Sequence, residues 1–164
     1  MIALEKVLQL FGQNKVDFII VGGAAAIVHG STRLTQDLDL VYSRGKENLE
    51  KIVQTLKPYH PYLRGAPEGL PFFWDIQTLN QGLNFTLTTD LGSVDLLGEI
   101  TGGGNYQDLL PHTITIELFG IKCLCLNLDK LIATKKAAGR PKDLEAVAEL
   151  TLIQQASEKM IDSF

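Results

Sequence analysis

Asp37-Leu38-Asp39-Leu40-Val41-Tyr42 is the stretch of sequence that most constrains the fold of this chain. Alternate side chains of a β-strand lie on the same face, so Asp37 and Asp39 share one face while Leu38 and Leu40 share the other. Two carboxylates this close repel each other unless a cation lies between them. Magnesium suits such a site because it binds oxygen ligands, commonly one or two carboxylates together with substrate phosphates. The stretch therefore predicts a strand with a cation site on its polar face.

Upstream of this strand, a short apolar run ends in a pair of glycines. Residues 18–21 have the pattern of a buried strand, Gly22 and Gly23 follow, and residues 24–29 are typical of a short helix that ends at Gly30. Glycine lets the backbone approach a phosphate closely, and the N–H groups at a helix start point toward an anion. Glycine pairs also end strands for steric reasons alone. The position of this pair directly upstream of the two aspartates is what favours a phosphate-binding turn.

Downstream, Asp95 is the leading candidate for a third carboxylate. It lies in the strand-like run Val94-Asp95-Leu96-Leu97, where an aspartate among apolar residues has no structural reason of its own. If this strand pairs beside residues 37–42, three carboxylates can hold two cations, an arrangement suited to in-line displacement at phosphorus with Asp95 as the base. Asp90 and Glu99 are the alternatives for the third ligand.

The remaining pattern predicts an alternation of helices and strands in one domain over residues 1–164. We expect helices over residues 2–13, 24–29, 46–57, 127–138 and 141–155, and strands over 18–21, 37–42, 84–89, 93–97, 113–118 and 121–126. Residues 59–71 are rich in proline and glycine and predict a loop, and residues 102–104 predict a flexible segment. This order indicates an α+β fold with a mixed β-sheet and helices packed on it.

The composition fits a small intracellular protein. Its 164 residues are 45% apolar, enough to form a core, and its net charge of −4 excludes a globally basic surface for nucleic acids. The two cysteines, Cys123 and Cys125, alternate on one predicted strand and are poorly placed to bond to each other, so we expect buried thiols in a reducing compartment. No basic leader and no apolar run of about 18 residues is present, which predicts a cytoplasmic protein without a membrane partner.

Two motifs resemble those of known nucleotidyltransferases. Val21-Gly22-Gly23, followed after residues 24–36 by Asp37-Leu38-Asp39-Leu40, resembles the signature of the DNA polymerase beta-like nucleotidyltransferase superfamily. Residues 131–144 resemble the C-terminal motif of its minimal, AbiEii-toxin-like branch. Together with Asp95, the resemblance extends from about residue 18 to residue 150. It implies a nucleotidyltransferase-like fold.

The resemblance also implies roles for individual residues. Asp37, Asp39 and Asp95 would be the catalytic carboxylates and the ligands of Mg²⁺ or Mn²⁺. Gly22 and Gly23 would shape the phosphate-facing turn, but many members have serine at the second of these positions. Side chains of the following connection are candidates to compensate for that serine: Ser31, Thr32, Arg33 and Thr35. Arg33 is the best suited to a phosphate by charge and geometry. Cationic side chains near the C-terminus would neutralise phosphates: Lys135, Arg140 and Lys142.

Several of these residues also have purely structural interpretations. Arg33 is equally well explained by an ion pair with a surface acid, and the cations of residues 135–142 by the solvated faces of two helices. For His29 we favour a helix-end residue over a catalytic base. For the aromatic residues 72–74 we favour packing in the core or fixing of the proline-rich loop over stacking on a nucleobase.

The resemblance implies an enzyme that transfers a nucleoside monophosphate from an NTP to a hydroxyl and releases pyrophosphate. Candidate acceptors are a protein side chain, a tRNA end and a small molecule such as an aminoglycoside. The toxin-like branch favours a toxin–antitoxin or phage-defence context with a cognate partner. The main alternative is a catalytically silent nucleotide-binding or antitoxin-like module. A glycosyltransferase that uses a DxD motif is a third hypothesis, which the short chain and the strand-borne acids disfavour.

Overall fold

The computed structural model describes residues 4–162, and its framework is a mixed seven-stranded sheet. The strands lie in the order β3-β4-β5-β2-β1-β9-β8. Their bounds are β1 Phe18–Ile20, β2 Asp37–Tyr42, β3 Tyr62–Leu63, β4 Asn84–Thr89, β5 Gly92–Leu97, β8 Thr113–Leu118 and β9 Ile121–Leu126. The central strand β2 pairs in parallel with β5 and antiparallel with β1, and β1 pairs in parallel with β9. A separate small hairpin joins β6 (Glu99–Ile100) to β7 (Gly104–Asn105).

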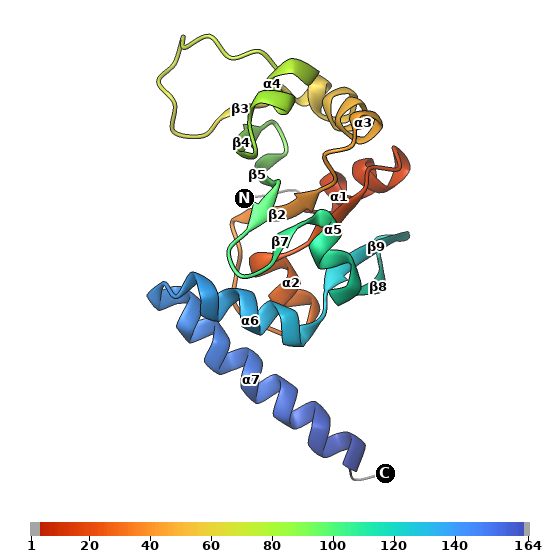
Figure 1. Cartoon of the computed structure of the whole chain (residues 1–164), viewed down its shortest axis with the longest axis vertical. Helices are drawn as coiled ribbons and strands as arrows, with labels where there is room; N and C mark the ends of the chain where they lie inside the picture. The colour runs from red at the N-terminus through yellow and green to blue at the C-terminus, as the bar shows by residue number, and fades with distance from the viewer. Residues whose placement is uncertain (1–3, 163–164) are drawn as a thin grey trace.

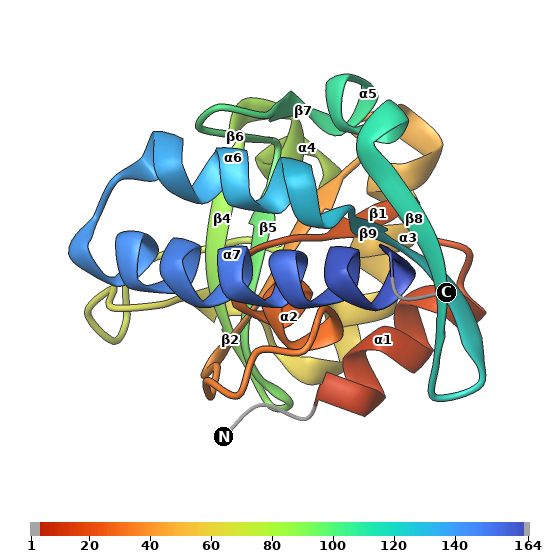
Figure 2. The ribbon, with the colours of Figure 1, turned by 90° about the horizontal axis from the view of Figure 1, so that it is seen from below.

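Seven α-helices pack around these strands. Their bounds are α1 Leu4–Gln13, α2 Gly22–Val28, α3 Lys46–Leu56, α4 Ile76–Gln81, α5 Tyr106–Leu109, α6 Leu128–Ala138 and α7 Pro141–Asp162. Figure 1 shows α3 and α4 on one side of the central strands and α6 and α7 on the other. From below, α6 and α7 cross in front of the sheet (Figure 2). The predicted α+β class, with a mixed sheet and helices packed on it in a single domain, is confirmed.

The alternation that places the aspartates on one face of β2 also builds the core. Leu38 and Leu40 are fully buried, as are Val94 and Leu96 at the same level of β5. Helices α1 and α3 bury their apolar stripes in the same core, through Val7, Leu8 and Phe11, and through Leu49, Ile52 and Leu56. The polar face of β2 is therefore held in place by a rigid apolar layer behind it.

Most predicted elements appear within one or two residues of their expected bounds, and the exceptions are short or terminal. The predicted loop over residues 59–71 contains the two-residue strand β3, and the sequence reasoning missed α4 and α5. Helix α7 extends to Asp162 rather than to about residue 155. In the glycine segment predicted to be flexible, Gly102 and Gly103 lie in the turn of the β6–β7 hairpin, and Gly104 begins β7 and pairs with Ile100. Residues 2 and 3 of the first predicted helix lie outside the described residues.

Residues 64–75 form a long connection that projects from the molecule (Figure 1). Aromatic side chains anchor its two ends: the Phe72 ring lies 5.8 Å from the Tyr62 ring and 6.4 Å from the Trp74 ring, between centroids. The Trp74 indole N–H donates a hydrogen bond of 3.0 Å to the Val53 carbonyl on α3. Phe73, between them, is 71% exposed. The expectation that these aromatic residues pack the core or hold the loop is confirmed for Phe72 and Trp74 and is wrong for Phe73.

The two cysteines are buried thiols that are not bonded to each other, as the sequence predicts. Cys123 and Cys125 are free and buried on β9, and burial raises the pKa of both thiols, that of Cys125 to about 12. Within residues 4–162, none of the helices combines the length and apolar character needed to cross a bilayer.

Candidate active site

Strand register brings the three predicted aspartates to one place on the sheet. In the parallel ladder between β2 and β5, Asp39 lies directly opposite Asp95, and Asp37 lies opposite Ser93. Residues opposite each other in a ladder point to the same face, so all three carboxylates share the polar face of the sheet. The predicted pairing of these strands is confirmed. Asp90, one alternative third acid, instead accepts from His60 at 2.7 Å in the turn before β5.

The crowding of these acids disfavours full ionisation of Asp39. Burial, a hydrogen bond with Asp95 and the negative charges of Asp95 and Asp37 together raise the pKa of Asp39 to about 7. Burial also raises the pKa of Asp95, although Arg64 acts in the opposite direction. Burial and the neighbouring negative charges are separate causes, and both disfavour the ionised form of a carboxyl group. The cluster therefore favours an added positive charge.

An arginine that the sequence reasoning did not single out supplies such a charge. One terminal nitrogen of Arg64, Nη1, lies 3.1 Å from Asp37 Oδ1, and the other, Nη2, forms an ion pair and hydrogen bond with Asp95 Oδ1. The Arg64 side chain is 30% exposed and that of Asp95 is 16% exposed. The guanidinium thus bridges two of the three carboxylates.

The carboxylates suit a divalent cation in chemistry, but the arginine engages two of them. Hard divalent cations bind oxygen ligands, and the carboxylates of Asp37, Asp39 and Asp95 supply such ligands on one face of the sheet. Within the described part of the chain, however, no three acidic, imidazole or thiol side chains are grouped as ligands of one ion. The Arg64 guanidinium contacts both Asp37 and Asp95.

The glycine pair lies against the aspartates. Gly22 has a φ of +62°, and a Cβ at this position would collide with the Asp39 carboxylate. At Gly23 a Cβ would lie 2.8 Å from Thr35 Oγ1 and 3.1 Å from Thr35 Cβ. The Thr35 hydroxyl, which donates to the Asp37 carbonyl at 2.9 Å, therefore occupies the space beside Gly23. The two glycines let the start of α2 pack directly on the polar end of β2.

Lys135 of α6 and Arg140, which lies between α6 and α7, add two cations to the site. Lys135 lines the same hollows as Asp39 and Asp143, and burial lowers the pKa of its ammonium while these two carboxylates act to raise it. Arg140 donates from Nε to Asp143 Oδ2 at 2.6 Å and from Nη2 to Asp143 Oδ1 at 3.2 Å. Asp143 is 4% exposed, whereas the Arg140 side chain is 62% exposed. The buried aspartate thus holds an exposed guanidinium in a fixed orientation.

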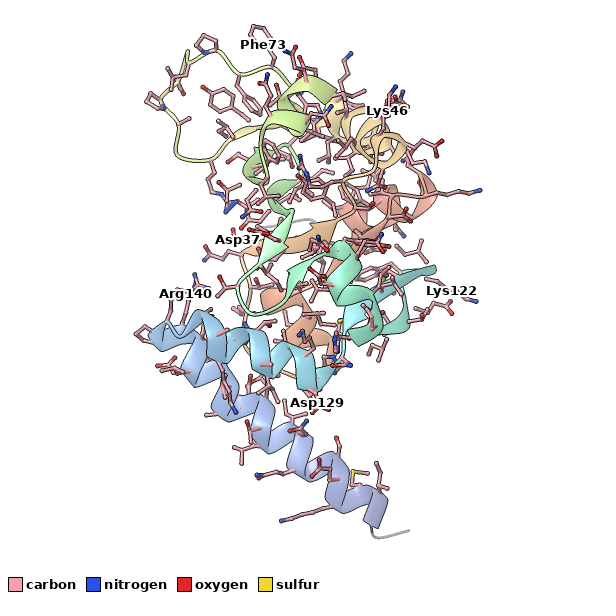
Figure 3. The ribbon with its side chains drawn as sticks, in the orientation of Figure 1. Asp37, Lys46, Phe73, Lys122, Asp129 and Arg140 are labelled. Atoms are coloured by element: carbon pink, nitrogen blue, oxygen red, sulfur yellow. The ribbon has the colours of Figure 1, made fainter. Side chains whose placement is uncertain are left out.

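Two adjoining hollows share this group of residues. Both are lined by Gly22, Asp39, Lys135, Arg140 and Asp143. The larger, of about 430 Å³, continues along an apolar wall: Val21, Leu97, Ile100 and Ala138. The smaller, of about 210 Å³, continues past Gly23, Thr35, Asp37 and Lys142. Figure 3 shows Asp37 and Arg140 near each other and Lys122 at a distant edge of the molecule.

The connection before β2 is fastened to α7 by acidic side chains. Ser31 donates to Glu149 at 2.5 Å and Thr32 donates to the same carboxylate at 3.2 Å. Arg33 pairs with Glu145 at 3.4 Å, which is the structural alternative anticipated for it. Of the residues expected to compensate for the missing serine, Thr35 alone has its hydroxyl beside Gly23. Ser31 and Arg33 still line the smaller hollow.

His29 has the structural role expected for it. It ends α2, and its Nε2 lies 2.7 Å from the Leu126 carbonyl oxygen, where it donates a hydrogen bond. It therefore takes no part in the group of carboxylates.

Two residues of the site were not assigned roles from the sequence. Arg64 lies in a proline- and glycine-rich stretch, and only the pairing of the short strand β3 with β4 reveals its position. Asp143 lies three residues after Arg140, a spacing at which helical side chains meet, and this spacing is the signal that could have identified the pair.

Solved structures of nucleotidyltransferases share this fold at low sequence identity. The lincosamide antibiotic adenylyltransferase LnuA, solved with lincomycin bound, is 19% identical with a TM-score of 0.60, over 92% of this chain and 95% of that one. The ANT(2'')-Ia complex with adenylyl-2''-tobramycin is 12% identical with a TM-score of 0.55, over 96% of each chain. A putative nucleotidyltransferase from Thermotoga maritima is 16% identical with a TM-score of 0.50, over 100% of this chain and 97% of that one.

Sequence comparison identifies the family directly. No match was found among curated proteins. Residues 1–164, the whole chain, match the family described as nucleotidyltransferase of unknown function (DUF6036). The chain therefore belongs to this nucleotidyltransferase family.

Proposed function

We propose that this chain transfers a nucleoside monophosphate from an NTP to a hydroxyl acceptor in a reaction that depends on Mg²⁺ or Mn²⁺. The acceptor oxygen forms a bond to the α-phosphorus, the bond between that phosphorus and the bridging oxygen breaks, and pyrophosphate leaves with the electron pair. The observation that carries the proposal is the convergence of Asp37, Asp39 and Asp95 on one face, beside a glycine turn and Lys135.

The proposed roles follow from the position of each side chain. The three aspartates hold the divalent cations, which neutralise phosphate charge and orient the triphosphate when bound. Asp95, which is less exposed than Asp37, would accept the proton that the acceptor hydroxyl loses. Gly22, Gly23 and Thr35 form the wall against which phosphates lie. Most of the catalysis is positioning and charge neutralisation, because phosphoryl transfer needs little covalent chemistry from the protein.

The basic side chains around the hollows fit the triphosphate. Lys135 and the Asp143-bound Arg140 line both hollows, and Lys142 lines the smaller one. An arginine held by a buried carboxylate loses little freedom when it binds a phosphate, so its orientation favours binding. The same cations would neutralise the negative charge of the pyrophosphate as it leaves.

The acceptor is proposed as a hydroxyl of a small molecule, a protein or a tRNA end. The low-identity fold neighbours named for lincosamide and tobramycin chemistry support a small-molecule acceptor. The AbiEii-like motif supports a macromolecular acceptor and a toxin–antitoxin or phage-defence context, with a cognate partner protein in the cytoplasm.

The test is direct. Purified protein is incubated with each NTP and Mg²⁺ or Mn²⁺, pyrophosphate release is measured, and candidate protein, RNA and antibiotic acceptors are examined by mass spectrometry for an added nucleotide. We expect transfer by the wild type and a loss of at least a hundredfold in Asp37→Asn and Asp39→Asn, which remove a charge and keep the shape. Lys122→Ala, on the distant β9, is the matched control. Full activity in either aspartate variant would contradict the proposal.

A silent nucleotide-binding or antitoxin-like module is the second candidate, and two observations favour it. Arg64 engages two of the three carboxylates, and position 23, where the superfamily resemblance implies a serine in many members, is glycine. Equilibrium binding of NTP with no pyrophosphate release under all metal conditions would favour this candidate.

A further inference from the structure

We propose that Arg64 is an internal counter-cation that competes with divalent cations for the acidic cluster, so that metal binding requires its guanidinium to leave Asp37 and Asp95. This inference rests on the proposed function, because it assumes that these aspartates are metal ligands. It adds a residue from the β3 edge to the site and assigns it a defined step before catalysis.

The sheet itself determines the position of Arg64. Its backbone N–H donates to the Thr86 carbonyl at 2.9 Å, which continues the β3–β4 ladder by one residue. Thr86 is opposite Asp95 on β5, and Asp95 is opposite Asp39 on β2. Arg64 thus lies on the row of residues that crosses the cluster, two strands from Asp95. An arginine side chain spans that distance, so its contact with the acids is a consequence of register.

The hydrogen bonds of the Arg64 guanidinium are incomplete in its position between the carboxylates. Both terminal nitrogens bind carboxylates, and this neutralises charge that would otherwise repel. Nε, in contrast, is buried and is the single such side-chain nitrogen or oxygen in residues 4–162 without a hydrogen-bond partner. A buried unpaired donor disfavours the conformation that contains it. The bound orientation is therefore stabilised by the acids and opposed by its own Nε.

The Arg64 side chain can rotate away from the acids into solvent. Arg64 begins the projecting connection of residues 64–75, directly before Gly65, which has a φ of +80° and open space around it. The backbone of β3 remains paired when the side chain rotates, since its hydrogen bonds do not involve the guanidinium. Rotation about the side-chain bonds moves the charge from the acids to solvent without unfolding an element.

Manganese binding to the nucleotide-free protein tests the proposal without any measurement of catalysis. Mn²⁺ is titrated into wild type, Arg64→Ala, Arg64→Gln and Arg64→Lys, and free Mn²⁺ is measured by electron paramagnetic resonance. We expect Arg64→Ala and Arg64→Gln to bind Mn²⁺ about tenfold more tightly than wild type, which corresponds to about 1.4 kcal/mol. Arg64→Lys keeps the charge but lacks the two-pronged contact, so its Mn²⁺ affinity should lie between that of the wild type and that of Arg64→Gln.

Two controls separate local competition from a general change in charge. Lys122→Ala removes one positive charge from β9, which lies beyond β1 from the cluster, and should bind Mn²⁺ as the wild type does. Asp39→Asn in the Arg64→Ala background should lose the tighter binding, which locates it at the cluster. Circular dichroism confirms that each variant is folded, and Arg64→Lys or Arg64→Gln replaces Arg64→Ala if the latter is not.

The outcomes distinguish this proposal from the proposed function. Equal or weaker Mn²⁺ binding by the folded Arg64→Ala and Arg64→Gln variants, with binding that still depends on Asp39, overturns the competition and leaves the metal-dependent function standing. Absence of Mn²⁺ binding in every variant overturns both. Tighter binding that depends on Asp39 supports both.

Discussion

Position 23 shows how one residue of the site limits its neighbours. A side chain at Gly23 would meet Thr35 Oγ1 at 2.8 Å and Thr35 Cβ at 3.1 Å, distances below ordinary contact. A serine at this position is thus incompatible with threonine at position 35 unless the connection before β2 moves. In this chain the Thr35 hydroxyl, fixed by the Asp37 carbonyl, is the group that replaces it.

This conflict leads to a prediction about a pair of substitutions. Gly23→Ser should lower the free energy of unfolding by about 1–3 kcal/mol, the usual cost of overpacking. Thr35→Ala removes the closest atom, so the double variant should recover part of that loss. Urea unfolding of the four proteins of the cycle gives the coupling energy, which is expected to be positive for residues in contact. Additive effects of the two substitutions would show that the side chains do not meet.

Single residues divide into those that the sequence could identify and those that it could not. Asp37 and Asp39 were identifiable because alternation along one strand places them on the same face, and Asp95 because its strand pairs with theirs in the expected way. Arg64 was not, because its place depends on which edge strand pairs with β4 and in what register. The orientation of Arg33 toward Glu145 also depends on tertiary contacts, since 112 positions separate the two residues.

At the scale of the element, α6 depends on its cap. Asn127 accepts a hydrogen bond of 2.8 Å from the Lys130 backbone N–H, and the helix ends at Gly139 in the left-handed conformation. Asn127→Ala should lower the free energy of unfolding by about 1 kcal/mol, because one backbone donor loses its partner. Asn127→Asp, which keeps the acceptor, should unfold as the wild type does. Denaturant titration followed by circular dichroism measures both, and an equal loss in the two variants would argue against capping.

The first turn of α7 leads to a prediction about nucleotide affinity. Burial alone would raise the pKa of Asp143, but hydrogen bonds and the charge of Arg140 hold it below its usual value, so the pair is ionised. Asp143→Asn removes the charge and the two-pronged contact that orient Arg140. We expect NTP binding to weaken by about tenfold, since a freely rotating guanidinium must be ordered on binding.

Isothermal titration with a non-hydrolysable NTP measures this effect. Glu145→Gln is the matched control, because Glu145 lies two residues away on the same helix and pairs with Arg33 rather than with Arg140. A loss of affinity equal to that of the control would exclude an orienting role for Asp143.

Whole elements were predictable where a period or a cap was present. The hairpin of β8 and β9 and the ends of α6 were found because alternation, Asn127 and Gly139 mark them. Helix α4 has six residues, too few to show a helical period, although Asp75 caps it by accepting from the Thr78 N–H at 2.8 Å. Strand β3 has two residues and depends wholly on β4 for its existence.

For the whole molecule, the acidic cluster predicts how stability varies with pH. The pKa of Asp39 is about 7 in the folded protein and 3.8 when unperturbed, so between these values the folded state holds a proton that the unfolded state releases. Stability of the metal-free protein should therefore fall as pH rises from about 4 through 7, by on the order of a few kcal/mol. Asp95 contributes in the same direction, because its pKa is also raised.

Urea unfolding in the presence of EDTA across this range measures the effect. Asp39→Asn, which stays neutral at every pH, should flatten the profile and be more stable than wild type above pH 7. A profile that rises toward pH 7 in the wild type, or that is unchanged in Asp39→Asn, would contradict the assignment. If the expected profile is found, stability and catalysis have opposite requirements. The ionised Asp39 carboxylate that is proposed to bind the metal ion is also the charge that destabilises the metal-free fold.

Helix α7 contacts the site on two sides, which we call its margins, and so fixes their positions relative to each other. Asp143 holds Arg140 on one margin, and Glu149 holds Ser31 and Thr32 on the other. Each residue added to a helix turns everything beyond it by about 100°. An insertion between positions 143 and 149 would thus misalign one margin against the other, whereas one beyond Leu150, the last fully buried residue of α7, would leave both in step. Evolutionary change in chain length along this helix should accordingly be confined to its distal half.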